Sequence, residues 1–281
     1  MNITGNIHAL KLYFRINAVP GVVVDRSVYV FLIFQKDITL IDTGVSAGRE
    51  DIFNYIREHG RDPGEIGKVF LTHSHPDHIG ALKFIKEKAG CSVFMHEQGR
   101  AWTEDTELQA VERPVPGFRG LVSGSCRVDG VLRDGDVISA GENMTIRVVH
   151  TPGHSPDSLS FYCEEDRVLI SGDLILKKGD MPVYDDHFRL KASLEKIRSI
   201  GFDILLSSWS DPVKGDEAGA MIEESIAYLE HIDDIVMSIT GGRIPDDGMV
   251  FCSEVVKAAG LPPACVNPIV MRSFLSHLER R

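Results

Sequence analysis

Apolar residues recur along the chain with two periods, one typical of strands and one typical of helices. Runs rich in β-branched and aromatic residues predict strands in the first half at residues 7–16, 22–34, 37–42, 68–72 and 92–95. Similar runs predict strands further on at residues 128–132, 144–150, 159–163, 167–170 and 203–206. Apolar positions spaced three and four apart predict helices between them at residues 48–59, 79–89 and 191–200.

Beyond Gly215 the apolar pattern is helical to the end of the sequence. It predicts helices at residues 216–239, 251–259 and 266–279. Asn267-Pro268 supports the last of these, because Asn is a favoured N-cap and Pro is favoured at the first helical position. We therefore expect a core domain at residues 1–215 and a helical extension, packed on that core, at residues 216–281.

Residues 97–125 have the least regular pattern, because several prolines and glycines interrupt it. A helix is expected at about residues 98–111. Loops of this kind carry specificity, so we expect the segment to cover the mouth of a ligand site. Trp102, Phe118 and Arg119 are its candidates for substrate contact, and an ordinary connecting loop is the alternative.

The densest candidate chemistry is His73-Ser74-His75-Pro76-Asp77-His78, which lies between a predicted strand and a predicted helix. In open α/β sheets, ligand sites gather at the carboxyl ends of strands. His73 and His75 are two residues apart, so an extended loop points both to one side. Asp77 and His78 follow where the chain turns into the helix, so they can face a second ion. Histidine and carboxylate ligands suit zinc, iron, nickel or manganese. The alternative to a metal site is a polar turn whose histidines are solvated.

This stretch resembles the signature of the metallo-β-lactamase superfamily, and three further motifs follow the family's order. They are Leu40-Ile41-Asp42-Thr43-Gly44, Thr151-Pro152-Gly153-His154-Ser155 and Ser171-Gly172-Asp173. The resemblance covers roughly residues 20 to 215 and implies an α+β fold, a four-layer αββα sandwich, with a C-terminal helical extension. It also implies that Asp42 supports the histidine loop from behind and orients a ligand histidine, with a turn-capping role as the alternative.

The resemblance implies a set of metal ligands as well. One ion is held by His73, His75 and His154. A second ion is held by Asp77, His78 and a final histidine, and Asp173 bridges the two.

The chain departs from the family at that final histidine, where the sequence reads Ser-Ser-Trp-Ser-Asp-Pro-Val from Ser207 to Val213. Trp209 is closest to the expected place, and an indole donates hydrogen bonds and does not bind metals. Asp211 is the candidate replacement ligand, and a turn before Pro212 is its alternative role. His187 is a further candidate ligand, and Tyr184 is a candidate for a substrate hydrogen bond.

The expected cofactors are one or two divalent metal ions, with zinc first and iron or manganese as alternatives. The resemblance implies a metal-dependent hydrolase, and we favour a small ester or thioester substrate as in glyoxalase II-like members. Asp77 is the expected catalytic residue, which orients the attacking water. One alternative is a mononuclear iron, persulfide dioxygenase-like enzyme that uses His73, His154 and Asp173. A non-catalytic metal-binding module is the other alternative.

Composition narrows the possible partners. The net charge of −11 and the pI of about 5.4 argue against nucleic acid, which needs a basic surface. No apolar run approaches the roughly 20 residues of a membrane span, and no secretory signal is visible at the start. The five cysteines are odd in number and lack CxxC pairing, which favours a reducing compartment. We expect a cytoplasmic protein with a small-molecule substrate, no membrane or nucleic-acid partner, and a homodimer as an option.

Overall fold

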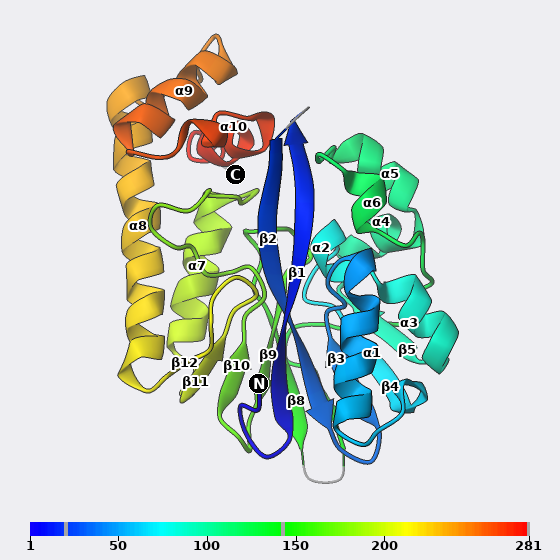
Figure 1. Cartoon of the computed structure of the whole chain (residues 1–281). Coiled ribbons are helices and arrows are strands. Elements are labelled where there is room, and N and C mark those ends of the chain that lie inside the picture. The colour runs from blue at the N-terminus through cyan, green and yellow to red at the C-terminus, as the bar shows by residue number, and fades with distance from the viewer. Residues whose placement is uncertain (20–21, 142–143, 280–281) are drawn as a thin grey trace.

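The computed structural model of the 281-residue chain describes residues 1–19, 22–141 and 144–279. Two six-stranded sheets lie face to face, and helices cover their outer sides (Figure 1). The prediction of an α+β, four-layer αββα sandwich is confirmed.

The first sheet is built from the N-terminal half of the chain. Its strands, in spatial order, are β1 (Ile7–Val19), β2 (Val22–Phe34), β3 (Ile38–Ile41), β4 (Ile66–Phe70), β5 (Ser92–Met95) and β6 (Gly130–Val131). The first three strands are antiparallel, and β3 to β6 are parallel. The parallel strands therefore end at one edge of the sheet, where their following loops meet.

The second sheet is built from the next segment of the chain. Its strands, in spatial order, are β12 (Val213–Lys214), β11 (Ile204–Leu206), β10 (Val168–Ile170), β9 (Leu159–Cys163), β8 (Thr145–His150) and β7 (Val137–Ser139). All neighbours are antiparallel except β10 and β11, which are parallel. Phe70 of the first sheet and Phe161 of the second pack with ring centroids 5.9 Å apart, inside the apolar layer between the sheets.

Helices cover both outer sides of the sandwich (Figure 1). On the first sheet's side lie η1 (Ser46–Gly48), α1 (Arg49–Glu58), η2 (Pro63–Glu65), α2 (Pro76–Ile79), α3 (Leu82–Ala89), η3 (Glu97–Gly99), α4 (Arg100–Glu104), α5 (Thr106–Glu112) and α6 (Phe118–Leu121). On the second sheet's side lie α7 (His187–Arg198) and α8 (Asp216–Thr240), with α9 (Gly248–Ala258), η4 (Pro263–Cys265) and α10 (Pro268–Leu275) at their upper end. Within the described ranges, no helix has the length and apolar character that a membrane crossing needs.

The C-terminal helices form an apolar cluster with α7, in which Leu194, Leu229 and Phe274 are fully buried. Helix α10 also holds the loop before α7: the Tyr184 amide donates to Ser273 Oγ at 2.9 Å, and that hydroxyl donates to the Tyr184 carbonyl at 2.8 Å. The predicted division of the chain at residue 215 stays a prediction.

Three helical expectations differ from the structure. The helix expected at 79–89 is α3 alone from Leu82, because Ile79 is the last residue of α2. The helix expected at 98–111 is two helices, α4 and α5, because the Asp105 carboxylate accepts from two backbone amides and starts a new helix. The helix expected at 191–200 begins earlier, because His187 is the first residue of α7. There Asp186 is the N-cap, and its carboxylate accepts from the Arg189 amide at 3.0 Å.

The sequence Asp134-Gly135-Asp136 is typical of a β-hairpin turn, but in the structure it has a different role. The strand before it, β6, pairs in parallel with β5, whereas the strand after it, β7, pairs with β8 of the other sheet. The turn therefore carries the chain from one sheet to the other. A turn motif shows where the chain reverses, and it does not show which strand becomes the neighbour.

Removal of the Phe274 side chain tests how α10 is held. Phe274→Ala should lower the free energy of unfolding by about 3–5 kcal/mol, because it leaves a cavity in a fully buried cluster. Ile244→Ala is the control, since Ile244 is 73% exposed and its removal should have little effect. Chemical denaturation of both variants measures the difference, and equal stabilities would contradict the packing described.

Candidate metal centre

Four loops meet at the carboxyl edge of the two sheets. The loop after β4 carries His73 to His78, and the loop after β8 carries His154. Asp173 follows β10, and Trp209 follows β11. The parallel directions of β4 and β5, and of β10 and β11, bring these loops to one place, as open α/β sheets do for their ligands.

Gly172 allows the two sheets to approach closely at this edge. Its φ is +56°, and a Cβ there would lie 2.9 Å from the Thr72 Cβ. A larger residue would therefore push apart the loops that carry His73 and Asp173. The Ser208 amide donates to the Gly172 carbonyl at 3.1 Å, which fixes the loop after β11 as well.

Three buried imidazoles converge at the centre of the edge. His73 Nε2 and His154 Nε2 each lie 2.9 Å from His75 Nδ1. The three ring planes are inclined to one another by 72–84°. Ring nitrogens that approach one point from nearly perpendicular planes have the arrangement of ligands around a metal ion.

The hydrogen bonds of the outer ring nitrogens fix two of the tautomers. His154 Nδ1 lies 2.8 Å from the Val183 carbonyl, which only accepts, so Nδ1 carries the proton. His73 Nδ1 lies 3.0 Å from Thr72 Oγ1, whose own proton goes to Asp42 Oδ2, so His73 Nδ1 is also a donor. In neutral rings, the inner Nε2 atoms of His73 and His154 therefore carry lone pairs.

These lone pairs need a cation between them. Burial, and then the neighbouring positive charges, hold the pKa of His73 and of His75 well below its usual range, so the rings are neutral. His75 Nδ1 has at most one proton and can satisfy only one of the two facing nitrogens. Its own Nε2 is buried without a hydrogen-bond partner. The donor set fits a divalent ion such as zinc, which imidazole nitrogens bind in this way.

A second group of ligand atoms lies beside the first and consists of His73, His78 and Asp173. His78 Nε2 lies 3.2 Å from Asp173 Oδ1 and 3.9 Å from Asp77 Oδ2. Burial alone would lower the pKa of His78, and the surrounding carboxylates, Asp173 first, raise it well above its usual range. The pKa of Asp77 is raised, chiefly because it is buried. A divalent cation held between these groups would offset the carboxylate charges as a proton on His78 does.

Asp173 lies between the two groups. Its Oδ2 is 3.4 Å from His154 Nε2 and 3.8 Å from His73 Nε2, while its Oδ1 faces His78. Burial alone would raise the pKa of Asp173, but the charges of His78 and His154 hold it below its ordinary value. The carboxylate is therefore ionised and placed to bridge two ions.

Asp42 orients the histidine loop from behind, as its motif predicted. Its carboxylate accepts from the Thr72 amide and hydroxyl, both at 2.7 Å, and from His78 Nδ1 at 2.8 Å. Asp42 is fully buried, and its φ of +58° is uncommon for a residue with a Cβ. The hydrogen bond leaves His78 Nε2 facing Asp173, which is the supporting role that carboxylates play for ligand histidines.

Asp211 is not brought to this cluster. Its side chain is 72% exposed, and its carboxylate accepts from Lys11 Nζ at 2.9 Å and from the Tyr29 hydroxyl at 2.6 Å. The hypothesis that it replaces the final histidine therefore has no geometric support. Trp209 lies on the same loop, two residues before Asp211, and it is 42% exposed.

His187 and Tyr184 belong to a different cluster. His187 and His277 lie near Asp233, but their rings are stacked 4.0 Å apart at 16°. These three side chains form a group of possible ligand atoms separate from the two groups described above. Tyr184 is 1% exposed, and its hydroxyl lies 2.7 Å from His277 Nε2, so it does not face substrate as expected. His277 Nδ1 lies 2.8 Å from Asp233, so Tyr184, His277 and Asp233 link α10, α8 and the loop before α7.

The segment at 97–125 reaches the site through residues other than those predicted. Trp102 Nε1 donates to Glu112, and Arg119 pairs with Glu107. Phe118 is buried. The residue that contacts the metal loop is Gln109, whose Nε2 donates to the Ser74 carbonyl at 2.6 Å.

Asp157 was also missed, and its Oδ2 accepts from the Ser74 amide at 2.8 Å. Together, Asp157 and Gln109 fix the peptide between His73 and His75. The only sequence signal was that Asp157 lies three residues after His154.

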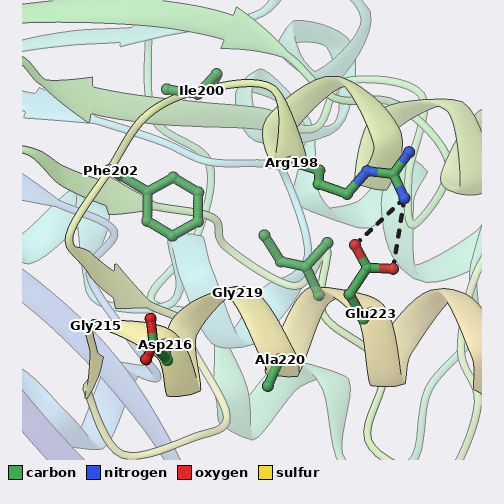
Figure 2. A pocket seen from close by; sticks show the side chains of 9 residues that line it. Arg198, Ile200, Phe202, Gly215, Asp216, Gly219, Ala220 and Glu223 are labelled. Atoms are coloured by element: carbon green, nitrogen blue, oxygen red, sulfur yellow. Dashed lines mark hydrogen bonds and ion pairs between the residues drawn. The ribbon is translucent and has the colours of Figure 1, made fainter.

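A separate hollow lies at the opposite edge of the second sheet (Figure 2). It is lined by Arg198, Ile200, Phe202, Gly215, Asp216, Gly219, Ala220, Ile222 and Glu223. Residues 198–202 precede β11, whereas the metal centre follows the ends of the strands. Arg198 pairs with Glu223 at 3.3 Å in this hollow, so its charge is already compensated.

Comparisons with known proteins agree with the geometry. The sequence profile of the metallo-β-lactamase superfamily matches residues 23–209. A probable metallo-hydrolase of Bacillus subtilis is 32% identical over 149 residues, which are 53% of this chain and 66% of that protein. A hydroxyacylglutathione hydrolase of Rhodopseudomonas palustris is 28% identical, over 50% of this chain and 47% of that protein. The acyl-coenzyme A thioesterase MBLAC2 of Gallus gallus is 30% identical, over 50% and 54%.

These curated relatives are matched over about half to two thirds of their own length. Among solved structures, a metallo-β-lactamase family protein of Thermus thermophilus superposes with a TM-score of 0.76 at 20% identity. That match covers 98% of this chain and 93% of the other, so it supports the fold over nearly the whole chain.

Replacement of Asp173 tests the ligand set. Asp173→Asn should weaken divalent-metal binding at least tenfold, because the amide removes the charge that lies between the two groups of ligands. Asp211→Asn is the matched control and should keep the full metal content, since Asp211 binds Lys11 and Tyr29. Elemental analysis after dialysis measures both, and a selective loss in Asp211→Asn would show that the described ligand set is wrong.

Replacement of Asp42 tests the support behind the loop. Asp42→Asn should lower metal affinity about 10- to 100-fold, as is usual when the partner of a ligand histidine is lost. Asp37→Asn, at an acid that precedes the same strand, is the control. Competition with a chromogenic chelator gives both affinities, and an unchanged affinity in Asp42→Asn would contradict this role.

Proposed function

The chain belongs to the metallo-β-lactamase superfamily, and from this premise we propose that it is a metal-dependent hydrolase that cleaves a small ester or thioester. The observation that carries the proposal is the convergence of His73 Nε2, His75 Nδ1 and His154 Nε2 in a buried place that their own protons cannot satisfy. His78, Asp77 and Asp173 supply the ligand atoms for a second ion beside it.

Bound divalent ions would lower the pKa of a water molecule toward neutrality and polarise the substrate carbonyl. The chain's own residues orient the histidines that would bind these ions. Asp42 and the Val183 carbonyl hold the protonated nitrogens of His78 and His154 away from the centre. Asp157 and Gln109 hold the Ser74 peptide, which keeps His73 and His75 in place.

Asp77 is the proposed catalytic carboxylate. Its side chain is buried except for a small part, and that burial raises its pKa, which suits a group that holds and passes on a proton. In thioester hydrolysis, the water oxygen joins the acyl carbon and the carbon–sulfur bond breaks. One water proton passes through Asp77 to the leaving sulfur, and the other stays with the acid product.

The choice of substrate class is supported by relatives. A hydroxyacylglutathione hydrolase and an acyl-coenzyme A thioesterase, both matched over about half of this chain, are named for acylated thiols. An ester or thioester has an activated carbonyl, so its cleavage needs only a bound water and a proton carrier.

One observation favours a second candidate, a mononuclear iron enzyme of the persulfide dioxygenase type. His73 Nε2 and His154 Nε2 lie within 3.8 Å of Asp173 Oδ2, which gives two histidines and one carboxylate. The missing final histidine also weakens a second ion site. Iron as the native metal, with oxygen uptake on glutathione persulfide, would favour this candidate.

Metal removal and restoration test the proposed function. The protein should cleave simple acyl thioesters when loaded with zinc, manganese or iron, lose this activity after chelation, and regain it when the metal is returned. Asp77→Asn should lower kcat about 100-fold or more at full metal occupancy, because it removes the proton carrier. Thiol release followed by absorbance gives the rates, and a fully loaded protein inactive on all esters and thioesters would overturn the proposal.

A further inference from the structure

Arg113 is a buried arginine that faces the metal loop. It is 7% exposed and directly follows α5. Its amide donates to the Gln109 carbonyl at 2.8 Å, so the two residues are one helical turn apart and project from the same face. Gln109 on that face donates to the Ser74 carbonyl between His73 and His75. The fold therefore directs the Arg113 guanidinium toward the metal centre.

The charge of Arg113 reaches the metal ligands. It is the second largest cause, after burial, that lowers the pKa of His75, and it also acts on His73 and Asp77. Burial in turn lowers the pKa of Arg113, and the charges of Asp185 and Asp77 oppose this.

Among the residues that the structure describes, the Arg113 side chain makes no hydrogen bond and no ion pair within 4 Å. Buried arginines are almost always paired, because an unpaired buried charge is strongly unfavourable. The carboxylates of Asp77 and Asp173 offset part of this charge, but they are also the proposed metal ligands. With metal bound, these two carboxylates would no longer compensate Arg113, while Asp185 would still act on it without forming an ion pair. An anion from outside the chain would give the guanidinium a direct partner.

A second arginine, the exposed Arg272, is close enough for its charge to act on Arg113. Arg272 lies on α10, next to Ser273, whose hydroxyl binds the loop before α7. Its charge acts on Arg113 and on Asp185, as the shifts of their pKa values show. Asp185 is the acid whose charge raises the pKa of Arg113 most, and among the described residues it forms no ion pair within 4 Å with either arginine. In Figure 1, α5 and α10 stand on either side of the upper ends of β1 and β2, above the edge that carries the site.

We propose that Arg113, assisted by Arg272, binds an anionic group of the substrate, a carboxylate or a phosphate, next to the metal centre. This inference rests on the proposed function and narrows it to acyl thioesters that carry a negative charge. The planar guanidinium of Arg113 presents paired N–H donors that match either anion, and its burial strengthens the bond. The arginine thereby selects the substrate and positions its carbonyl, and Asp185 limits how tightly the anion is held.

Matched substrates test the proposal on the zinc-loaded full chain. Acetyl and succinyl thioesters of N-acetylcysteamine differ by one carboxylate on the acyl side. Acetyl-glutathione and acetyl-coenzyme A place carboxylates or phosphates on the leaving thiol. We expect at least one charged substrate to exceed the neutral one about 10- to 100-fold in kcat/KM, the range of a hydrogen bond to a charged group. The best of the four identifies the anion and its side of the scissile bond.

Variants assign this preference to the arginine. Arg113→Met should reduce the charged-to-neutral ratio to near one, chiefly through KM, and Arg113→Lys should keep part of it. Arg119→Met is the control, because Arg119 lies in the same segment but is exposed and paired with Glu107. Arg119→Met should leave the charged-to-neutral ratio of kcat/KM unchanged. An unchanged ratio in Arg113→Met would overturn the proposal.

Thermal unfolding gives a readout that does not depend on activity. Succinate or inorganic phosphate should raise the Tm of the zinc-loaded protein, and Arg113→Met should abolish this rise. Arg113→Met without added anion should be as stable as the parent or more stable, because it removes an unpaired buried charge. If no thioester is cleaved but the anion-dependent rise in Tm is present and depends on Arg113, the proposed function fails and the anion site stands. If neutral and charged thioesters are cleaved equally and no anion raises the Tm, the anion site is wrong and the proposed hydrolase function stands.

Discussion

The structure depends on one electrostatic constraint, the meeting of imidazole lone pairs in a buried place. His73 and His154 have their protons committed to Thr72 and to the Val183 carbonyl, so both present bare nitrogens to His75 at 2.9 Å. A protein that lacked a use for this arrangement would relax it by rotating one ring toward solvent. Here hydrogen bonds hold the rings in place, and Asp42 supports them from behind. The positive φ of Asp42 is a backbone conformation that costs free energy.

The architecture explains how these groups are brought together. Each sheet contributes loops from one edge, and Gly172 lets the loops approach within van der Waals contact. The C-terminal helices take part indirectly, because α10 binds the segment before α7 that supplies the Val183 carbonyl to His154. Tyr184, His277 and Asp233 join the same elements through buried polar contacts. The candidate metal centre, the loop before α7 and the C-terminal helices are therefore directly connected.

The sequence predicted the features that depend on short motifs or on local residue patterns. The strand patterns, the four-layer fold and the supporting role of Asp42 agree with the structure, because each depends on residues close in the chain or on a motif of fixed order. The contacts of Asp211 could not be predicted, because Lys11 and Tyr29, which bind it, lie some 180–200 residues away in sequence. Arg113 could not be singled out, since its lack of a partner is visible only once α5 is placed over the metal loop.

The most direct test of the central claim is a crystal structure of protein purified without chelators, with diffraction collected on both sides of the absorption edges of zinc, iron and manganese. The account predicts an anomalous peak within bonding distance of His73 Nε2, His75 Nδ1 and His154 Nε2, about 2.0–2.2 Å for zinc. A structure with full elemental metal content but no peak among these three nitrogens would contradict it.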